Sequence, residues 1–562
     1  MKRIAVLIAT LFLIGLIFPL VYVTGEPLYK ALNPQGYIPE IKQIPLAPRV
    51  PDLNDKVLYI ISSWPANVAS GFEDVLAALK GSLQKKYPRL NIIVKYKESA
   101  YMENEPQLWA EVKKKGDTFV YLAADSAATS MWSVVWSTGL EKNGTPGVDL
   151  VFDGFINNTQ ATCDKLGIRL RYVAVPSHGQ NLNAAQMASI VDQVTKGLTS
   201  PLTKPEKETG VIIPPNPARV ALEGTLEEIQ KYFYEKKWTD GLPIIPPTEK
   251  NVAQMLKGTS HRPDEIVTDK MIPEGWIATV EKVAVNGVMA GCKPDHMPVL
   301  LATVEAFAKG DYDSSVRSTN SFSFMQLING PIAKTIGMNP DTYALGPGNL
   351  SNATIGRALR LFIINLGGGV PEVNIMGNQG NVSCYSFCFP ENEAASPWEP
   401  FHVSRGYKAN ESTVTLFAGG WSHTGNMLHQ DIDRLARDIA YFQWPNGIVA
   451  LLSPLVAKDL HKKGLTKQQV QDHIWSHATL TMAEFRNDHY YQRFIIPVLK
   501  GREMYGRKYL WPASYLDLPD TARVPVYPRS EVFVVVVGSE ANGMMQGWKM
   551  AYPSTVSVDK WR

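Results

Sequence analysis

A glycine-rich segment that leads into a helix carries the clearest sign of chemistry in this sequence. Gly346 and Gly348 precede Asn349, Ser351 and Asn352, any one of which can cap a helix that extends to about residue 365. The exposed N–H groups and the dipole of such a helix start favour an anion. The sequence therefore predicts an anion-binding site, with an ordinary capped helix as the alternative. Its predicted members are Gly346, Gly348, Asn349, Ser351, Asn352, Thr354 and Arg357.

Cys292 is the first candidate for a nucleophile. It lies directly before the segment 298–308, which is apolar and predicts a helix. A cysteine near a helix start, with Lys293 and His296 beside it, has surroundings that lower a thiol pKa. We therefore predict Cys292 as the attacking thiol and His296 as an acid or base, and expect Cys292 to alkylate fastest of the four cysteines. The alternative is a small buried apolar side chain.

The segment 382–393 supplies further candidates. Its alternation of small and aromatic residues predicts a strand, on which the Cα atoms of Cys384 and Cys388 would be roughly 13 Å apart. A disulfide needs less than about 7 Å, so we expect no bridge between them. Cys388 is kept as a candidate catalytic thiol. Glu393, in the loop after the strand, is a candidate acid or base, with a solvated loop as the alternative.

The histidines and glycine motifs narrow the chemistry. His473 and His477 have the spacing of one helix face and could hold a metal, but no glutamate joins them in the zincin pattern. No metal site is therefore predicted. Residues 420–425 lack the spacing of a hydrolase elbow, and no dinucleotide fingerprint follows a predicted strand. The sequence thus names no cofactor.

Residues 54–200 are predicted to form the domain that carries the first group of elements. Short apolar runs alternate there with amphipathic helical stretches. Such alternation predicts a doubly wound parallel sheet with helices on both faces. Ligands of this architecture bind at the carboxyl ends of the strands, which here are residues 62–65 and 124–129. The predicted strands are 57–61, 91–96, 118–123, 148–152 and 170–175, and the predicted helices are 71–86, 130–142, 160–166 and 184–198.

Residues 54–200 also resemble the UGSC-like family. The resemblance rests on Tyr96-Lys97-Glu98, on the loop around Asp125 with the following Ser130-Met131-Trp132-Ser133, and on residues 140–146. That family is named for a selenocysteine or cysteine, Gly, Ser, Cys motif in this loop, whereas this chain has Ser126-Ala127-Ala128-Thr129. No thiolate can form there. The resemblance therefore implies the fold, with a domain that binds or only packs.

The larger C-terminal part, residues 221–562, is predicted to be a second domain. Helical and strand patterns alternate again, and the run from Glu531 to Val537 predicts a buried strand, so an α/β or α+β domain is expected. It resembles uncharacterised bacterial proteins that share phrases such as Ala290 to His296 and Tyr385 to Glu393. Residues 201–220, polar and proline-rich, are predicted to be a linker.

The N-terminus predicts a membrane anchor within residues 1–25. Lys2 and Arg3 precede 20 uncharged residues, from Ile4 to Val23, and a helix of that length spans roughly 30 Å. The flanking charges predict a cytoplasmic N-terminus and an extracytoplasmic body. A cleaved signal peptide is the alternative. Residues 26–53 are proline-rich and are expected to form an extended stalk.

Composition limits the classes of function. The 56 basic and 53 acidic residues are interspersed, which argues against a nucleic-acid partner. Four cysteines are too few for a disulfide framework. We expect a membrane-anchored enzyme, a lyase or a thiol-dependent transferase, for a small anionic ligand. This requires Cys292, Glu393 and the Gly346 loop to share a cavity. The alternative is a tethered protein that binds a small molecule or metal; the oligomeric state stays open.

Overall fold

The structure is a computed structural model that describes residues 26–66, 68, 70–176, 182–426, 432–441, 446–488, 490–502 and 510–562. The predicted anchor, from Ile4 to Val23, lies outside the described residues. Among the residues that are described, no helix is both long and apolar enough to cross a membrane.

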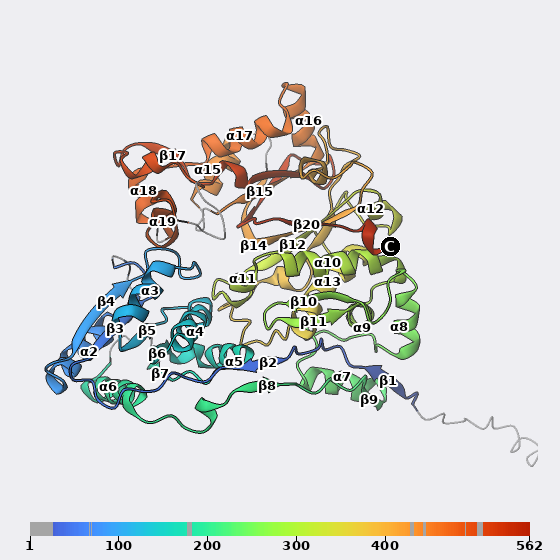
Figure 1. Cartoon of the computed structure of the whole chain (residues 1–562). Coiled ribbons are helices and arrows are strands. Elements are labelled where there is room, and N and C mark those ends of the chain that lie inside the picture. The colour runs from blue at the N-terminus through green and yellow to red at the C-terminus, as the bar shows by residue number, and fades with distance from the viewer. Residues whose placement is uncertain are drawn as a thin grey trace, which may run out of the picture.

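The N-terminal region is built on five parallel strands in the order β4-β3-β5-β6-β7, with helices on both faces (Figure 1). This confirms the predicted parallel sheet. Helices α2 and α6 pack on one face and α3 and α4 on the other. The elements are β3 (Val57–Ser62), α2 (Glu73–Lys86), β4 (Asn91–Tyr96), α3 (Pro106–Lys115), β5 (Thr118–Leu122), α4 (Ala127–Lys142), β6 (Gly147–Phe152), α5 (Ile156–Leu166), β7 (Tyr172–Val175) and α6 (Ala184–Thr199).

The segments before and after this sheet pair with each other. Strand β1 (Tyr29–Leu32) is antiparallel to β9 (Val220–Gly224), and β2 (Ile41–Gln43) is antiparallel to β8 (Gly210–Ile212). The two segments run along one side of both regions (Figure 1). Residues 26–53 are therefore extended, as predicted, but they do not stand apart as a stalk, because apolar side chains such as Leu32 and Leu53 are buried against the body.

The C-terminal region is built on a mixed sheet of seven strands, ordered β13-β12-β14-β19-β15-β18 with β20 beside β14. Its strands are β12 (Ser323–Asn329), β13 (Cys388–Pro390), β14 (Thr413–Asn426), β15 (Ile448–Leu452), β18 (Val532–Val536), β19 (Met544–Lys549) and β20 (Ser554–Ser557). Two short antiparallel pairs complete the strands: the hairpin β10 (Ile266–Met271) with β11 (Trp276–Thr279), and β16 (Thr479–Thr481) with the more distant β17 (Arg523–Pro525).

Helices cover this sheet in two groups. The longest of the first group, α13, starts at a cap formed by Asn349, one of the three capping residues that the sequence allows. The first group and its neighbours are α7 (Leu226–Glu235), α8 (Glu249–Leu256), α9 (Val280–Ala290), α10 (Met297–Lys309), α11 (Asp313–Arg317), α12 (Pro331–Thr335), α13 (Leu350–Asn365) and α14 (Phe401–Ser404). The second group is α15 (Ile432–Ala440), α16 (Pro454–Lys462), α17 (Lys467–His477), α18 (Met482–Asn487), a π-helical segment η6 (Tyr491–Ile495) and α19 (Ile496–Leu499).

The valine run near the C-terminus is a fully buried strand, as predicted. Val534 and Val536 of β18 pack with the second helix group, whereas Val535 and Val537 pack into an aromatic core on the other face. Successive side chains of a strand point to opposite faces, so four consecutive valines fill two cores at once.

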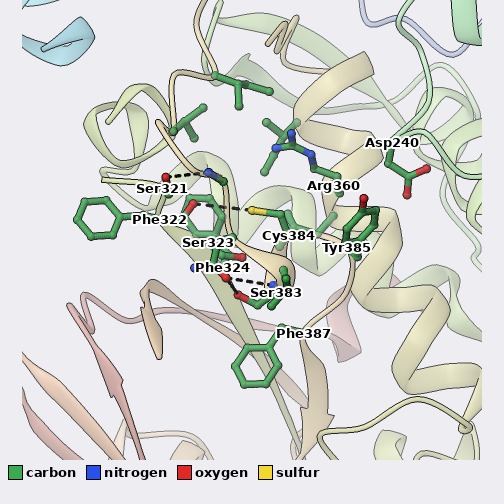
Figure 2. Close-up of a pocket in the computed structure, with 18 of the residues that line it drawn as sticks. Asp240, Ser321, Phe322, Ser323, Phe324, Arg360, Ser383, Cys384, Tyr385 and Phe387 are labelled. Carbon is green, nitrogen blue, oxygen red and sulfur yellow. Dashed lines mark hydrogen bonds between the residues drawn. The ribbon is translucent and has the colours of Figure 1, made fainter. Parts of the chain in front are cut away.

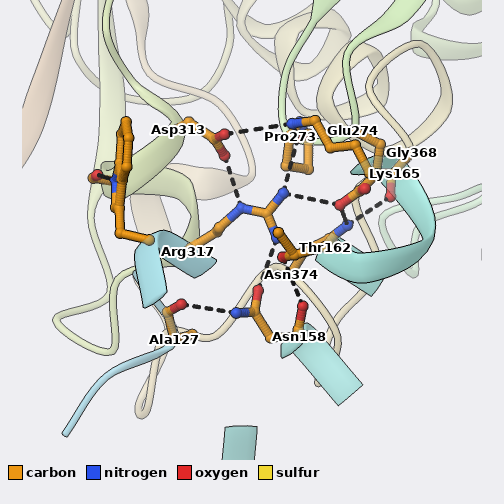
Figure 3. A network of polar contacts seen from close by, with 12 residues as sticks. Ala127, Asn158, Thr162, Lys165, Pro273, Glu274, Asp313, Arg317, Gly368 and Asn374 are labelled. Carbon is orange, nitrogen blue, oxygen red and sulfur yellow. Dashed lines mark hydrogen bonds and ion pairs between the residues drawn. The ribbon is translucent and has the colours of Figure 1, made fainter. Parts of the chain in front are cut away.

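A buried arginine joins the two regions (Figure 3). The Arg317 guanidinium donates to Asn158 Oδ1 of α5 at 2.7 Å, to Glu274 Oε1 at 2.9 Å and to Asp313 Oδ1 at 2.8 Å. Its side chain has no exposed surface. On the N-terminal side, Asn158 also donates to the Ala127 carbonyl at 2.7 Å. The charged hydrogen bonds of one side chain thus fix α4 and α5 of the first region to α11 of the second.

Candidate functional site

The predicted anion loop is a closed structural turn. Asn349 Oδ1 accepts from the Asn352 N–H at 3.0 Å and so occupies one of the free donors in the first turn of α13. Asn352 Nδ2 donates to the carbonyls of Asn339 and Ala344 at 2.9 and 3.1 Å. Gly348 takes a positive φ of 119°, which favours glycine. Gly346, two residues earlier, closes a turn with its N–H on the Tyr343 carbonyl at 2.9 Å.

The remaining members of this loop are also engaged within the protein. Ser351 Oγ donates to the Ile336 carbonyl at 2.6 Å, and Thr354 Oγ1 donates to the Leu350 carbonyl at 2.9 Å. Arg357 forms a bidentate pair with Asp240, at 2.8 and 2.9 Å. The anion held by Arg357 is therefore a carboxylate of this chain, and the described contacts of the loop are those of a capped helix.

Cys292 and His296 lie beside the start of α13, where neighbouring side chains pack against them. His296 Nδ1 accepts from the Lys293 N–H at 3.3 Å, and its Nε2 lies 3.1 Å from Ser351 Oγ. Burial lowers the pKa of His296 to about 4. Burial also raises the pKa of Cys292 to about 12, and the nearby Thr354 hydroxyl and Arg357 oppose this only in part. This direction is opposite to the one expected of an activated thiol, because burial disfavours the charged thiolate.

The predicted strand over residues 382–388 is wrong. Residues Val382–Cys384 form a 3-10 turn, and the strand contains only Cys388–Pro390. The turn forms because Asn381 Oδ1 accepts from the Ser383 N–H and hydroxyl at 3.1 and 2.6 Å, which competes with strand pairing. Both cysteines are free, as predicted. Cys388 is buried on β13, and this burial raises its pKa well above the ordinary value.

Glu393 lies in a separate polar cluster where the parallel strands β12 and β13 end. Its Oε1 accepts from Asn329 Nδ2 at 2.9 Å and from the Gly330 N–H at 2.7 Å. Glu391 accepts from the same Asn329 side chain at 2.6 Å and pairs with the buried Lys467 at 3.4 Å. These contacts hold the ends of two strands together. The structure therefore places Glu393 among strand-end contacts and Cys292 and His296 beside α13.

A cavity of about 450 Å³ lies on another face of α13, and none of the predicted site residues lines it. Figure 2 shows Arg360 of α13, Cys384, Tyr385 and Asp240 around this space. Phe322, Phe324, Leu359 and Ile363 supply its apolar wall. Cys384 Sγ lies 3.9 Å from the Phe322 carbonyl. The cavity therefore combines an apolar surface with a guanidinium, a thiol and a phenol.

Arg360 differs from its neighbour Arg357 on the same helix. It is half-buried, and among the described residues it makes no hydrogen bond or ion pair. A guanidinium presents five donors and suits carboxylate or phosphate groups. The sequence shows this arginine one turn after Arg357, but which of the two is paired depends on Asp240, 117 residues away.

A second cavity of about 770 Å³ shares with the first the wall made by residues 321–322 and 379–382. Ser321 fixes this wall, because its Oγ accepts from the N–H groups of Gln379 and Gly380 at 3.2 and 3.0 Å. Trp421 and Lys549 also line this second cavity. Burial lowers the pKa of Lys549 to about 6, an effect that Asp488 opposes. The two cavities thus share one wall, and each has a basic side chain in its lining, Arg360 in the first and Lys549 in the second.

The corresponding edge of the N-terminal sheet is covered. Trp64, which follows β3, packs edge-on against Tyr101 and against Phe494 of η6, with ring centroids 5.4 and 5.8 Å apart. The Arg493 guanidinium lies 4.5 Å from the Trp64 ring and pairs with Asp125 at 3.4 Å. Side chains of the C-terminal region thus occupy the place where a ligand of such a sheet would bind.

The loop that the resemblance singles out is a helix cap. Ser126 Oγ accepts from the Thr129 N–H at 3.2 Å, and Thr129 Oγ1 accepts from the Ser126 N–H at 3.0 Å, a reciprocal capping box at the start of α4. Ala127 and Ala128 are buried. Residues 126–129 therefore pack and cap, which agrees with the packing interpretation of this domain.

A known family model matches part of the chain. Residues 30–204 match the model of the UGSC family, a range that includes the five-stranded sheet, its helices, strand β2 and all but the first residue of β1. No curated protein matches the chain at a significant level. The parallel sheet at the N-terminus, with the two strands that precede it, is therefore a UGSC-like domain.

Proposed function

We propose that the C-terminal domain binds a small anionic molecule in the cavity beside α13, in a protein that residues 4–23 anchor with its body on the extracytoplasmic side of a membrane. The observation that carries the binding proposal is the contrast between two arginines of one helix. Arg357 is neutralised by Asp240 at 2.8 Å, whereas Arg360 reaches the cavity with no partner among the described residues. A ligand anion would supply the missing partner.

The rest of the cavity indicates the kind of anion. Phe322, Phe324, Leu359 and Ile363 favour an apolar body next to the charged group. The only carboxyl in the described cavity wall is Asp240, and Arg357 already compensates its charge. A carboxylate or phosphate monoester with an aliphatic or aromatic body therefore fits better than a cation or a sugar.

The test is a binding screen on the full chain with such carboxylates and phosphates, read by thermal shift and calorimetry. Arg360→Gln should weaken binding about 10- to 100-fold, since a charged hydrogen-bonded contact contributes about 1.5–3 kcal/mol. Arg405→Gln, at an exposed position outside the cavity, makes the same change of charge and should leave affinity unchanged. Equal affinities for Arg360→Gln and Arg405→Gln would contradict the proposal.

Arg360→Lys sharpens this test. Lysine keeps the charge but cannot offer the planar pair of donors that guanidinium presents. We expect intermediate affinity for a carboxylate or phosphate. The melting temperature without ligand should not change in any Arg360 variant, because no described contact is lost.

Catalysis is the second candidate, and the presence of Cys384 in the cavity wall favours it. In this proposal the bound anion is the substrate of a lyase or of a thiol-dependent transfer. Ligands found in the binding screen would be assayed for turnover with wild type and with Cys384→Ser. Binding without turnover in the wild type would leave a tethered binding protein.

The membrane proposal has a separate test. Expressed with its own N-terminus, the protein should stay with membranes through high-salt and carbonate washes. Recovery of a soluble species that begins near Glu26 would show a cleaved signal peptide instead.

A further inference from the structure

Two histidines and one aspartate lie close together at the surface of the second helix group. His473 and His477 lie four residues apart on α17, and Asp433 lies on α15. One ligand atom from each of the three falls within 4.8 Å of the others. The sequence shows the histidine pair, but the carboxylate comes from 40 residues earlier and only the packing of α15 against α17 supplies it.

The hydrogen bonds orient the two imidazoles for a metal. His477 Nδ1 lies 2.8 Å from the His473 carbonyl, to which it can only donate, so its Nε2 is left with a lone pair. His473 Nε2 is hydrogen-bonded to Asp433 Oδ1. The two rings stack with centroids 3.9 Å apart and an interplanar angle of 23°. A backbone carbonyl that fixes the tautomer of a histidine is a common outer contact of metal sites.

We propose that Asp433, His473 and His477 bind one divalent transition-metal ion, with Zn²⁺ as the representative. His473 Nε2 and Asp433 Oδ1 would give up the hydrogen bond between them, and the metal would take the place of the proton. Two imidazoles and one carboxylate suit Zn²⁺, Ni²⁺ or Fe²⁺ and disfavour Mg²⁺ and Ca²⁺, which prefer oxygen ligands.

The surroundings leave room for water on the metal. The side chains of His473 and Asp433 are 32% and 45% exposed, and His477 is exposed, so a fourth position faces solvent. Arg437, on the same helix as Asp433, acts electrostatically on this carboxylate. Its positive charge therefore opposes the binding of a cation. We therefore expect a site of moderate affinity that clamps α15 to α17.

The experiment is calorimetric titration of the full chain with Zn²⁺, with Mg²⁺ as the comparison ion. Wild type should bind one Zn²⁺, and His477→Gln and Asp433→Asn should each lower the affinity at least about tenfold. His461→Gln removes an exposed histidine of α16 that is outside the cluster, and it should bind as wild type does. Melting temperatures without metal should agree among the variants, since the changed groups are at the surface.

Substitution of Co²⁺ gives a second readout. The visible absorption of Co²⁺ reports nitrogen and oxygen ligands directly, and His477→Gln should abolish the band. Binding of Zn²⁺ by His477→Gln as tightly as by wild type, or no Zn²⁺ binding by wild type, would overturn the proposal. Equal response to Mg²⁺ would show only a weak surface cluster of charge and would overturn it as well.

Discussion

The two large sheets of this protein differ in how the space beside them is filled. At the N-terminal sheet, Trp64 is 2% exposed beneath Phe494 and Arg493, so side chains of the C-terminal region fill the usual ligand position. Beside the C-terminal sheet, a cavity of about 450 Å³ keeps an arginine without a described partner. Side chains thus fill the space at the edge of the first sheet, whereas the cavity beside the second leaves the space that the proposed binding requires.

The interface between the two regions is also formed by buried side chains. Arg317 enters the N-terminal region and meets Asn158, which in turn holds the carbonyl of Ala127 at the start of α4. The loop at residues 126–129, where the UGSC-like family has its motif, is thus part of an interface here. Loss of the interface should affect both regions, whereas loss of a cavity residue should affect only ligand binding.

The largest expected effect comes from Arg317→Met. Removing a buried guanidinium leaves Glu274 and Asp313 without their main charged partner, which costs about 3–5 kcal/mol of unfolding free energy. Guanidinium chloride unfolding should also separate into two transitions as the regions uncouple. Arg405→Met, at an exposed position, is the control and should remain within error of wild type. A single transition at the wild-type midpoint would show that this network does not join the regions.

Trp64→Ala tests the covered edge itself. Removing a buried aromatic side chain costs about 3 kcal/mol and opens a space between β3 and η6. Proteolysis after residues of the π-helical segment should become faster, because Phe494 of η6 loses its aromatic contact with the N-terminal region at Trp64. Leu28→Ala, at an exposed position of the N-terminal segment, should be neutral. If Trp64→Ala left stability unchanged, the edge would not be sealed by packing.

Asp149 gives the N-terminal sheet a dependence on pH. Burial raises the pKa of this carboxyl to about 7, above the value of about 3.9 in an unfolded chain. The folded state therefore holds a proton that the unfolded state releases, so stability is full below about pH 4 and falls as pH rises to about 7. Asp149→Asn stays neutral and should be more stable than wild type at pH 8, by up to about 4 kcal/mol.

The comparison for this prediction is the exposed Asp269→Asn. Urea unfolding at pH 4 and pH 8 should give the same difference between these pH values for Asp269→Asn as for wild type, and a smaller one for Asp149→Asn. A wild type whose stability rises from pH 4 to pH 8, with no change in Asp149→Asn, would contradict the assignment.

The cysteines give the smallest effect but compare the regions directly. Cys163, in the N-terminal core, and Cys292 both have pKa values raised to about 12 by burial, so little thiolate forms at neutral pH. Cys384 lies in the cavity wall. Iodoacetamide should label Cys384 about tenfold faster than the other three, by peptide mapping over time. Fastest labelling at Cys292 would restore the interpretation based on sequence.

Local patterns predicted what depends on neighbours in the chain. The strands of the N-terminal sheet, the cap at Asn349 and the valine strand all follow from periodicity and capping over a few residues. The segment 382–388 misled because the side chain of Asn381 competes with the strand ladder, which alternation alone does not show.

Contacts between distant segments decided the rest. Arg357 and Arg360 look alike in the sequence until Asp240 pairs with the first of them. Trp64 looks like a residue at an open sheet edge until Phe494 covers it. The helix that carries Arg360 could therefore be predicted from the sequence, whereas the cavity could be identified only from the structure.

The pairing of β1 with β9 also sets an order of events during synthesis. Tyr29 of β1 pairs with Gly224 of β9, so the first strand waits for a partner made about 190 residues later, roughly 10–40 s at ordinary elongation rates. The parallel sheet between them has all its strands before that moment. We expect the sheet to fold first and the β1–β9 and β2–β8 pairs to form afterwards, so that the segment before the sheet is fixed only when the segment after it has been made.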